Sequence, residues 1–438
     1  MNKKIALSVF ATALLGAANV QGADDLSTMF SEGKTSGQIR MFHINRDDNT
    51  KPDRQIATAI GGHLKFETAA YEGLNFGAAF YTTNRIFSGL EKDVVGPNTS
   101  LLANDGSSYS LLGEAYVQYA ISNTVFKGGR QKLDTPLAGS DDARMLPNLF
   151  EAYLLINKDI PDTTLIAGHV TKFAAGSFAN AYNGDILGAT AGYSTLAGNT
   201  AAYQGKFTDM GTWAIGKNTD GVSVVSATYT GVENLKLQLW DYYAHDILNA
   251  VYGEANFSWN CLVTDAIKPS LSAQIIKEDD VGDFDKKISS LYWGAKFDAK
   301  VSDFTLSLSY SQQSEADSAA ETLEKSTISP WGGMPAYTQG MVTRHQFMAG
   351  VDAAKVAANY NFKNVGANVN LTGYYVEFDM DDYSGYGTAR TASEAGFDAI
   401  YSPEAVKNLQ LRLRGNFPRD FKNGRDWDEY RLIANYNF

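Results

Sequence analysis

Hydrophobic and polar residues alternate along much of the chain with a period of two. The clearest stretch is residues 304–311, where the apolar or aromatic positions are Phe304, Leu306, Leu308 and Tyr310 and the positions between them carry Thr or Ser. Successive side chains of a strand point to opposite faces, so this pattern predicts a β-strand with one apolar and one polar face. The same alternation recurs in Asn364 to Tyr375, in Leu409 to Arg414 and in Tyr430 to the terminal Phe438.

Alternation and turn-forming residues together divide the chain into about 18 predicted strands. Their expected starting points are Gly37, Ile56, Leu74, Tyr109, Thr124, Phe150, Thr164, Val222, Leu235, Asn249, Ile267, Ile288, Phe304, Gln346, Gly366, Ala395, Leu409 and Glu429. Long connections at Ser88 to Ser108, Asp134 to Leu149, Ala174 to Gly221, Ser314 to His345 and Asp379 to Glu394 alternate with short ones such as Ser122 to Asn123. An even number of strands puts both chain ends on the side of the short turns, which is the periplasmic side of an outer-membrane barrel.

The N-terminus predicts export from the cytoplasm. Two lysines precede an apolar stretch, residues 5–15, that is too short to span a bilayer as a helix, and small residues follow it up to Gly22. We therefore expect a signal peptide over residues 1–22 and a single domain over residues 23–438. A buried N-terminal helix is the alternative, and the acidic residues that end the apolar run at Asp24 argue against it.

Composition agrees with a membrane β-barrel. No later segment is apolar enough for a membrane helix, so a membrane location requires a closed barrel, in which every backbone polar group is satisfied. The 24 Tyr and 23 Phe suit aromatic girdles, and the mean hydropathy of -0.24 suits a polar lumen. A net charge of -12 argues against nucleic acid as a partner. The single cysteine, Cys261, and five scattered histidines predict no disulfide, no metal site and no cofactor.

Arginines are expected to line one wall of the lumen. A barrel of 16 to 18 strands encloses an aqueous channel. If the leucines of the strand from Leu409 face lipid, Arg412 and Arg414 face the lumen. Arg431 does so on the closing strand, and Arg40 and Arg46 on the neighbouring first strand, without interleaved acids. This wall predicts a path for carboxylates; the alternative is general lumen polarity.

The connection from Asp134 to Leu149 is expected to fold into the lumen. It combines turn-forming residues with Leu137, Met145 and Leu146, which are poorly suited to an outer loop in water. The charged residues that would then form a constriction opposite the arginines are Asp141, Asp142 and Arg144. The alternative is a loop that caps the barrel and carries surface acids.

These residues resemble the OprD-type outer-membrane porins. The motifs that carry the resemblance are Gly129-Arg130-Gln131 with Asp134-Thr135-Pro136, Asp141-Asp142 with Arg144-Met145-Leu146-Pro147, Arg40-Met41-Phe42 with Arg46-Asp47, Tyr229-Thr230-Gly231, Leu411-Arg412-Leu413-Arg414 and Tyr430-Arg431-Leu432-Ile433. The resemblance implies an all-β barrel of 18 strands, an eyelet in the third outer loop that includes Arg144, and a basic ladder for carboxylates on Arg40, Arg412, Arg414 and Arg431. The segment from Trp331 to Tyr337 resembles a seventh-loop element, which would place Tyr337 near the constriction.

The sequence thus predicts an outer-membrane porin for passive diffusion of small carboxylate-bearing solutes, such as amino acids. Its expected partners are outer-membrane lipid and the outer-membrane assembly machinery, and either a monomer or a homotrimer fits. A non-selective porin is the nearest alternative, and a structural or adhesive barrel is another. A barrel hydrolase would need a base such as His169 or His345, but no recognisable serine motif accompanies them.

Overall fold

The structure is a computed structural model that describes residues 22–50, 54–86, 98–180, 185–193, 205–422 and 424–438. The predicted signal peptide lies outside these ranges except for Gly22. Parts of the predicted long connections that begin at Ser88 and at Ala174 also lie outside them. Among the described residues, no helix has the length and apolarity needed to cross a membrane.

Within the described ranges, nineteen strands form one antiparallel sheet. They are β1 (Lys34–Asp48), β2 (Gln55–Glu67), β3 (Leu74–Arg85), β4 (Tyr109–Ile121), β5 (Thr124–Gln131), β6 (Leu149–Asn157), β7 (Thr163–Ala174), β8 (Thr208–Asp209), β9 (Val222–Tyr229), β10 (Leu235–Ala244), β11 (Leu248–Ser258), β12 (Ile267–Asp280), β13 (Ser289–Val301), β14 (Phe304–Gln313), β15 (Val351–Asn361), β16 (Val369–Met380), β17 (Arg390–Tyr401), β18 (Leu409–Arg419) and β19 (Trp427–Asn437). The two-residue β8 pairs with one end of β7, and the other 18 strands form the wall of the barrel.

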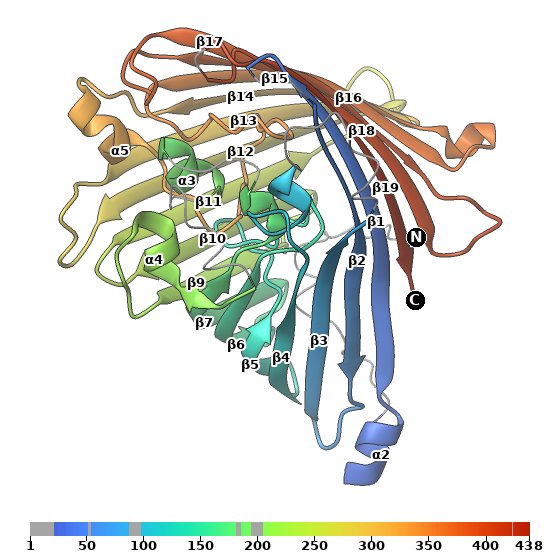
Figure 1. Ribbon diagram of the computed structural model, residues 1–438. Coiled ribbons are helices and arrows are strands. Elements are labelled where there is room, and N and C mark those ends of the chain that lie inside the picture. Colours follow the sequence, from blue (N-terminus) through green and yellow to red (C-terminus); the bar gives the residue numbers. More distant parts are fainter. Residues whose placement is uncertain (1–21, 51–53, 87–97, 181–184, 194–204, 423) are drawn as a thin grey trace.

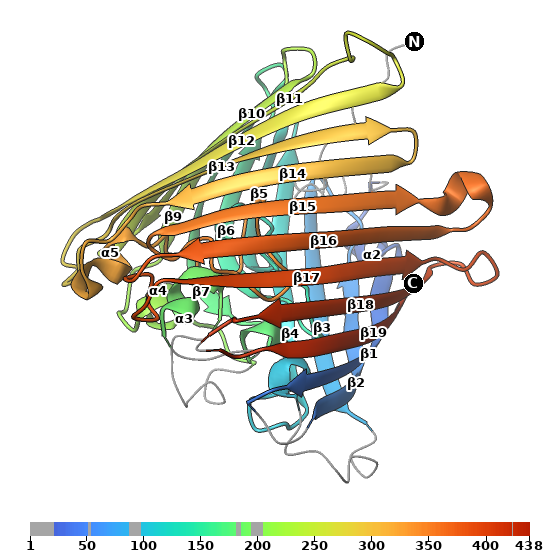
Figure 2. The same ribbon diagram turned by 90° about the horizontal axis from the view of Figure 1, so that it is seen from above.

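The sheet closes on itself between its first and last strands (Figures 1 and 2). Strand β19 pairs with β1 along 11 residues, and the backbones of Gly37 and Phe438 exchange hydrogen bonds of 2.9 and 3.1 Å just beyond that ladder. Closure leaves no unpaired edge among the 18 wall strands of the described residues, which is the condition for a sheet in lipid. The predicted antiparallel barrel of 18 strands is confirmed.

The strands begin within five residues of the predicted points, and two differ by the full five residues: the strand expected near Ala395 begins earlier, at Arg390, and the strand expected near Gln346 begins later. The strand expected near Gln346 begins only at Val351, because the preceding residues belong to a buried loop. The strand expected near Gly366 begins at Val369. A short helix, η5 (Phe362–Val365), precedes it and ends on Gly366, whose φ of 85° favours glycine. The alternation pattern therefore placed the start of this strand too early in the sequence.

Connections at the two ends of the barrel differ in length. At the end that holds both termini, turns such as Ser122 to Asn123 and Ser302 to Asp303 join consecutive strands, and Ser122 and Ser302 adopt positive φ. At the opposite end, the β5–β6 loop (residues 132–148), the β7–β9 loop (residues 175–221) and the β14–β15 loop (residues 314–350) are long. The predicted asymmetry of the connections is confirmed.

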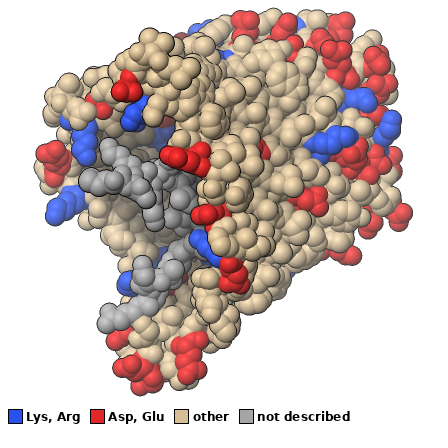
Figure 3. All heavy atoms as spheres, turned by 180° about the vertical axis from the view of Figure 1, so that it is seen from behind, with Lys and Arg blue, Asp and Glu red and all other residues tan. Residues whose placement is uncertain are grey.

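Large apolar side chains cover the outer face of the barrel. Exposed members of this surface include Ile39, Leu64, Phe80, Leu239, Leu271, Leu308, Leu413 and Leu432. Figure 3 shows a broad area without Lys, Arg, Asp or Glu on the face seen from behind, with charged side chains gathered mostly near its margins. Exposed apolar area of this extent would be unfavourable in water, and it fits the lipid-facing band of a membrane barrel.

The buried core lies inside the barrel, toward the end with the long loops. The helices of the structure are α2 (Leu26–Ser31), η1 (Thr99–Leu101), η2 (Ser177–Asn180), α3 (Asp185–Ala191), α4 (Met210–Ile215), η4 (Ala319–Glu321), α5 (Thr322–Lys325) and η5. Figure 1 shows α3 and the segment with η1 inside the ring of strands. Leu101 and Leu102 pack there in one apolar cluster with Met145 and Leu146 of the β5–β6 loop. The long loops therefore fill part of the lumen.

Candidate functional site

The β5–β6 loop folds into the barrel, as its apolar residues predicted. Leu137, Met145 and Leu146 are all buried. On one side the Leu137 N–H donates to the Tyr242 hydroxyl of β10 at 3.4 Å. On the other side the loop contacts β19 and β1, which lie half a circumference away from β10 in the strand order. A loop that reaches opposite walls narrows the channel between them.

A close approach of two backbones ties this loop to the β14–β15 loop. The Gly139 N–H donates to the Trp331 carbonyl at 3.0 Å. Gly332 has a φ of 75°, and a Cβ there would lie 2.0 Å from the Asn148 side chain and 2.7 Å from the Gly139 carbonyl oxygen. A larger residue than glycine would separate the loops. The segment that begins at Trp331, which the resemblance singled out, thus braces the constricting loop.

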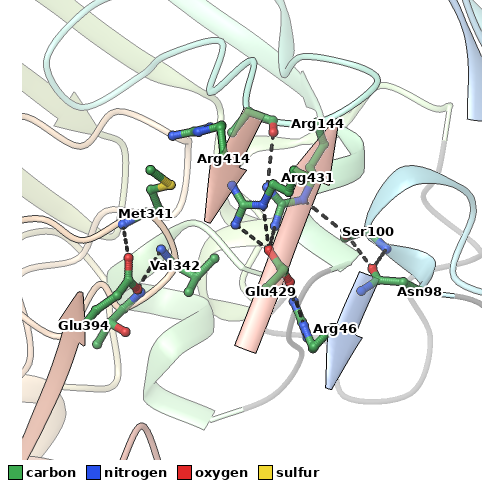
Figure 4. A network of polar contacts seen from close by, with 12 residues as sticks. Arg46, Asn98, Ser100, Arg144, Met341, Val342, Glu394, Arg414, Glu429 and Arg431 are labelled. Carbon is green, nitrogen blue, oxygen red and sulfur yellow. Dashed lines mark hydrogen bonds and ion pairs between the residues drawn. The ribbon is translucent and has the colours of Figure 1, made fainter. Parts of the chain in front are cut away.

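Three arginines share one buried carboxylate beneath the β5–β6 loop (Figure 4). Glu429 Oε2 lies 2.6 Å from Arg46 Nη2. The other carboxylate oxygen, Oε1, lies 2.5 Å from Arg431 Nη2 and 3.4 Å from Arg144 Nη2. Arg144 also donates to the Ser100 hydroxyl at 3.1 Å. An arginine stays protonated in proteins, so this cluster keeps an excess of positive charge.

This cluster changes the expected picture of the arginine wall. The sequence was interpreted as a wall without interleaved acids, and that interpretation was wrong: Glu429 lies between Arg46 and Arg431 and is itself buried. Arg144 was expected to be part of the eyelet, but its side chain has 0% exposure and faces Glu429 behind the loop. Arg46, Arg144 and Arg431 therefore anchor the loop to the wall rather than offer open surface.

Arg412 and Arg414 share the lumen face of β18 and pair with a carboxylate of β17. Arg412 Nε lies 2.7 Å from Asp398 Oδ1, and its Nη2 contacts the other carboxylate oxygen. Arg414 Nε lies 3.5 Å from Asp398 Oδ2. Arg414 is also the direct cross-strand partner of Arg431 on β19. Like charges opposite each other in a sheet repel, so this pair favours an anion between them.

Arg40 lies on the first strand at the edge of the same wall. Its Nε donates to Asn435 Oδ1 of β19 at 2.9 Å, and its Nη1 contacts the Arg144 carbonyl. Asp142, at the lumen side of the β5–β6 loop, accepts from Nη1 at 2.6 Å and from Nη2 at 3.2 Å. The structure therefore brings the predicted residues Arg40 and Asp142 together directly.

Asp141 pairs with an arginine that the sequence reasoning did not identify. Arg344 of the β14–β15 loop donates from Nη1 and Nη2 to the Asp141 carboxylate at 2.8 and 3.0 Å. Its guanidinium stacks over the Phe178 ring at 3.9 Å from the centroid. Burial opposes this charge, yet Asp141 and then Tyr193 raise the pKa of Arg344 above its usual value. The ion pair of Asp141 and Arg344 holds the β5–β6 loop and the β14–β15 loop together.

A second missed residue, Glu394 of β17, positions the rest of the β14–β15 loop. Its carboxylate accepts from the backbone N–H groups of Met341 at 2.6 Å, Val342 at 3.2 Å and Thr343 at 2.7 Å (Figure 4). Three backbone donors on one carboxylate make a strong, charge-assisted anchor. No local pattern links Glu394 to this loop, because the partners are more than 50 residues apart in the sequence.

Tyr337 lies away from the arginine wall. It is half-buried, and the Lys296 ammonium of β13 lies 5.4 Å from its ring centroid. Lys296 in turn pairs with Asp298 at 2.9 Å. Strand β13 lies five strands from β18 and six from β19 in the order of the 18 wall strands. Tyr337 therefore contacts a different part of the wall from the arginines, in the same loop that carries Arg344.

The two histidines considered as the base of a hydrolase lie on different elements, His169 on β7 and His345 in the β14–β15 loop. His169 Nδ1 is 3.1 Å from the Ser223 hydroxyl, and its Nε2 donates to the backbone carbonyl of Asp220 at 2.9 Å. His345 Nε2 donates to the Phe421 carbonyl at 2.8 Å. Within the described ranges, no group of three or more His, Cys, Asp or Glu side chains is arranged to hold a metal ion.

Comparisons with known proteins agree with this geometry. The family model of the OprD family of outer-membrane porins matches residues 29–438. This chain belongs to the OprD family. The family and the fold are those of channels, so this protein is an outer-membrane porin. No curated protein sequence is significantly similar to this OprD-family porin.

Solved porins of Pseudomonas aeruginosa share its fold. OpdK, solved with vanillate, matches with a TM-score of 0.75 at 19% identity, over 94% of this chain and 99% of the OpdK chain. OccK2 (OpdF), in complex with glucuronate, matches with a TM-score of 0.73 at 17% identity, over 95% of this chain and 99% of the OccK2 chain. OccK8 (OprE) matches with a TM-score of 0.72 at 16% identity, over 94% of this chain and 99% of the OccK8 chain. The predicted family and barrel are confirmed.

Proposed function

We propose that this porin mediates passive diffusion of small carboxylate-bearing solutes, and that both chain ends face the periplasm. The observation that carries the proposal is the cluster at Glu429, where three guanidinium groups share one carboxylate beside the constricting loop. Arg414 adds a fourth positive charge directly opposite Arg431. A local excess of fixed positive charge at a narrow point attracts anions and repels cations.

Arg412 and Arg414 would form the accessible part of the solute path. Their side chains keep 29% and 14% exposure, whereas Arg46, Arg144 and Arg431 are almost completely buried. Two relatives, OpdK and OccK2, were solved with vanillate and glucuronate, both of which carry a carboxylate. These ligands support the carboxylate as the recognised group here.

Replacing Arg412 and Arg414 together by Gln tests the proposal. Gln keeps polarity and most of the bulk, while each lost contact with a carboxylate is worth about 1 to 4 kcal/mol at 4 Å between water-like and surface-like dielectric. We expect glucuronate flux into porin-loaded liposomes to fall at least several-fold, while glucose flux stays nearly unchanged. Arg419→Gln is the matched control, because that arginine is half-exposed and pairs with Asp428 outside the lumen path.

Equal losses for glucuronate and glucose would contradict the proposal and favour a non-selective porin, in which the arginines shape the pore without selecting charge. Higher ionic strength should shrink the difference between wild type and the double variant, because salt screens charges that water reaches.

A further inference from the structure

Asp142 covers Arg40 in the way that a solute carboxylate would. Its two oxygens accept from Nη1 at 2.6 Å and from Nη2 at 3.2 Å, which is the bidentate geometry typical of an arginine with a carboxylate. The Asp142 side chain is 34% exposed and that of Arg40 is 8% exposed. The acid thus lies on the water side of the pair, where a passing anion meets it first.

Arg40 keeps its position through contacts that do not involve Asp142. Its Nε donates to the Asn435 side chain at 2.9 Å, and its Nη1 also contacts the backbone carbonyl of Arg144. Asn435 is itself held by the Gln410 side chain at 3.3 Å. If Asp142 turns away, the guanidinium stays in place with N–H groups directed to the lumen. Such a fixed group is a preorganised receptor for a carboxylate.

Asp142 can leave Arg40 without moving the loop. Its neighbour Asp141 is held by the two hydrogen bonds from Arg344, and Arg144 is held at Glu429. Between these anchors the chain forms a tight turn, with a φ of 37° at Asp141 and a 2.6 Å hydrogen bond from the Ala143 N–H to the Asp141 carbonyl. Rotation of the Asp142 side chain is therefore sufficient to uncover Arg40.

Asp398 provides a contrast on the same wall. Its side chain is 14% exposed, less than the 29% of its partner Arg412. Here the arginine lies toward the lumen and the acid lies behind it. A solute reaches Arg412 without displacing Asp398, so this acid orients the arginine and does not cover it.

We propose that Asp142 is a tethered carboxylate that competes with the solute for Arg40. A solute carboxylate accepts the two N–H groups of Arg40, and Asp142 rotates into the lumen water; as the solute moves on, Asp142 returns. The inference rests on the proposed function, since it assumes carboxylate solutes. The exchange makes binding at this point weaker and release faster, which a channel needs for throughput.

Asp142→Asn tests the exchange, because Asn keeps the shape but loses the charge that holds Arg40. The probe is glucuronate added to single channels in planar bilayers that conduct chloride. We expect the half-saturating glucuronate concentration to fall by roughly two- to five-fold, as for the loss of a partly exposed ion pair, and each interruption of the current to lengthen. Glucose should have the same effect on the current through the wild-type channel and through the Asp142→Asn channel. Asp142→Ser is a second variant that also removes the competing carboxylate.

Two comparisons separate exchange at Arg40 from a general gain of positive charge. Asp428→Asn removes the same charge from the outward face of β19, where Asp428 pairs with Arg419 at 2.8 Å, and should leave glucuronate binding unchanged. In an Arg40→Gln background, Asp142→Asn should lose its effect. The same gain in both backgrounds, or no gain from either Asp142 variant, would overturn the proposal. If Arg412 and Arg414 also prove irrelevant to glucuronate, the proposed function itself fails.

Discussion

Glu429 compensates three arginines at once, and this single residue decides which of the lumen arginines are open to solutes. A guanidinium cannot lose its proton when it is buried, so it needs a partner or an anion. Arg46, Arg144 and Arg431 find that partner in Glu429, which leaves their positive excess inside the wall. The accessible sites are therefore set by burial as well as by the direction of each side chain.

Some of these contacts could have been found in the sequence, and others could not. Glu429 lies two positions before Arg431 on the same strand, so alternation places both side chains on one face. The pair of Asp141 and Arg344 joins two loops that are 203 residues apart, and nothing local predicts which arginine meets which acid. Arg144 was correctly placed in the inward-folded loop, but its direction depended on the partner at Glu429.

His345 predicts an effect of pH on the contact between two loops. It lies in the β14–β15 loop, packs against the Phe421 ring at 4.8 Å between centroids, and donates to the Phe421 carbonyl. Burial lowers the pKa of His345 to about 4 from 6.5, and nearby Arg390 acts in the same direction. The neutral form therefore stabilises the contact above about pH 6.5, and the contribution is lost as the pH falls toward 4, by up to about 3 kcal/mol.

Hydrogen exchange of residues 342–348, corrected for its intrinsic pH dependence, measures this effect. We expect protection to decrease between pH 7 and pH 4 in the wild-type protein. In His345→Gln, which can still donate to the Phe421 carbonyl but does not titrate, the decrease should be absent. The same decrease in both proteins would assign the pH dependence to other groups.

At the scale of elements, the β5–β6 loop makes a direct prediction about pore width. Removing residues 139–144 takes out the segment that carries the loop's contacts with Trp331 and Glu429. Single-channel conductance should rise by a factor of roughly two or more, because strand number fixes the width of the wall and the loop narrows it. Removing residues 283–286 from the β12–β13 loop is the control, and it should leave conductance unchanged. No rise in the first variant would mean that the loop caps the barrel without constricting it.

Strands were predictable because the alternation that marks a strand of a membrane barrel lies within the strand's own sequence. Every second residue faces lipid, so the apolar face of a strand such as β14 can be recognised from its own residues. The helix η5, which has local caps at Asn361 and Gly366, replaced the expected start of β16, because alternation does not mark a short helix. Elements that are stabilised by distant contacts were not predictable. The path of the β14–β15 loop depends on Glu394 and Asp141, which lie far from it in the sequence.

At the scale of the molecule, closure joins residues that the chain separates most. The first and last strands pair, so Arg46 of β1 lies opposite Glu429 and Arg40 opposite Asn435, on the strand that carries Arg431. The alternation and the even strand count were enough to predict this neighbourhood, because a closed barrel must pair its ends. The acids on the strands themselves, Glu429 and Asp398, were the missing part, whereas Asp142 of the β5–β6 loop was expected opposite the arginines and does pair with Arg40.

The reversal potential of single channels in a potassium chloride gradient tests the central claim most directly. If the excess positive charge of the arginine wall, at Glu429 and at Asp398, governs permeation, the wild-type reversal potential lies toward the chloride equilibrium potential. Replacing Arg412 and Arg414 by Gln should move it toward zero, because these are the more exposed arginines of the wall. A wild-type channel that prefers potassium would contradict an arginine wall that selects anions. An unchanged reversal potential after both substitutions would contradict it as well.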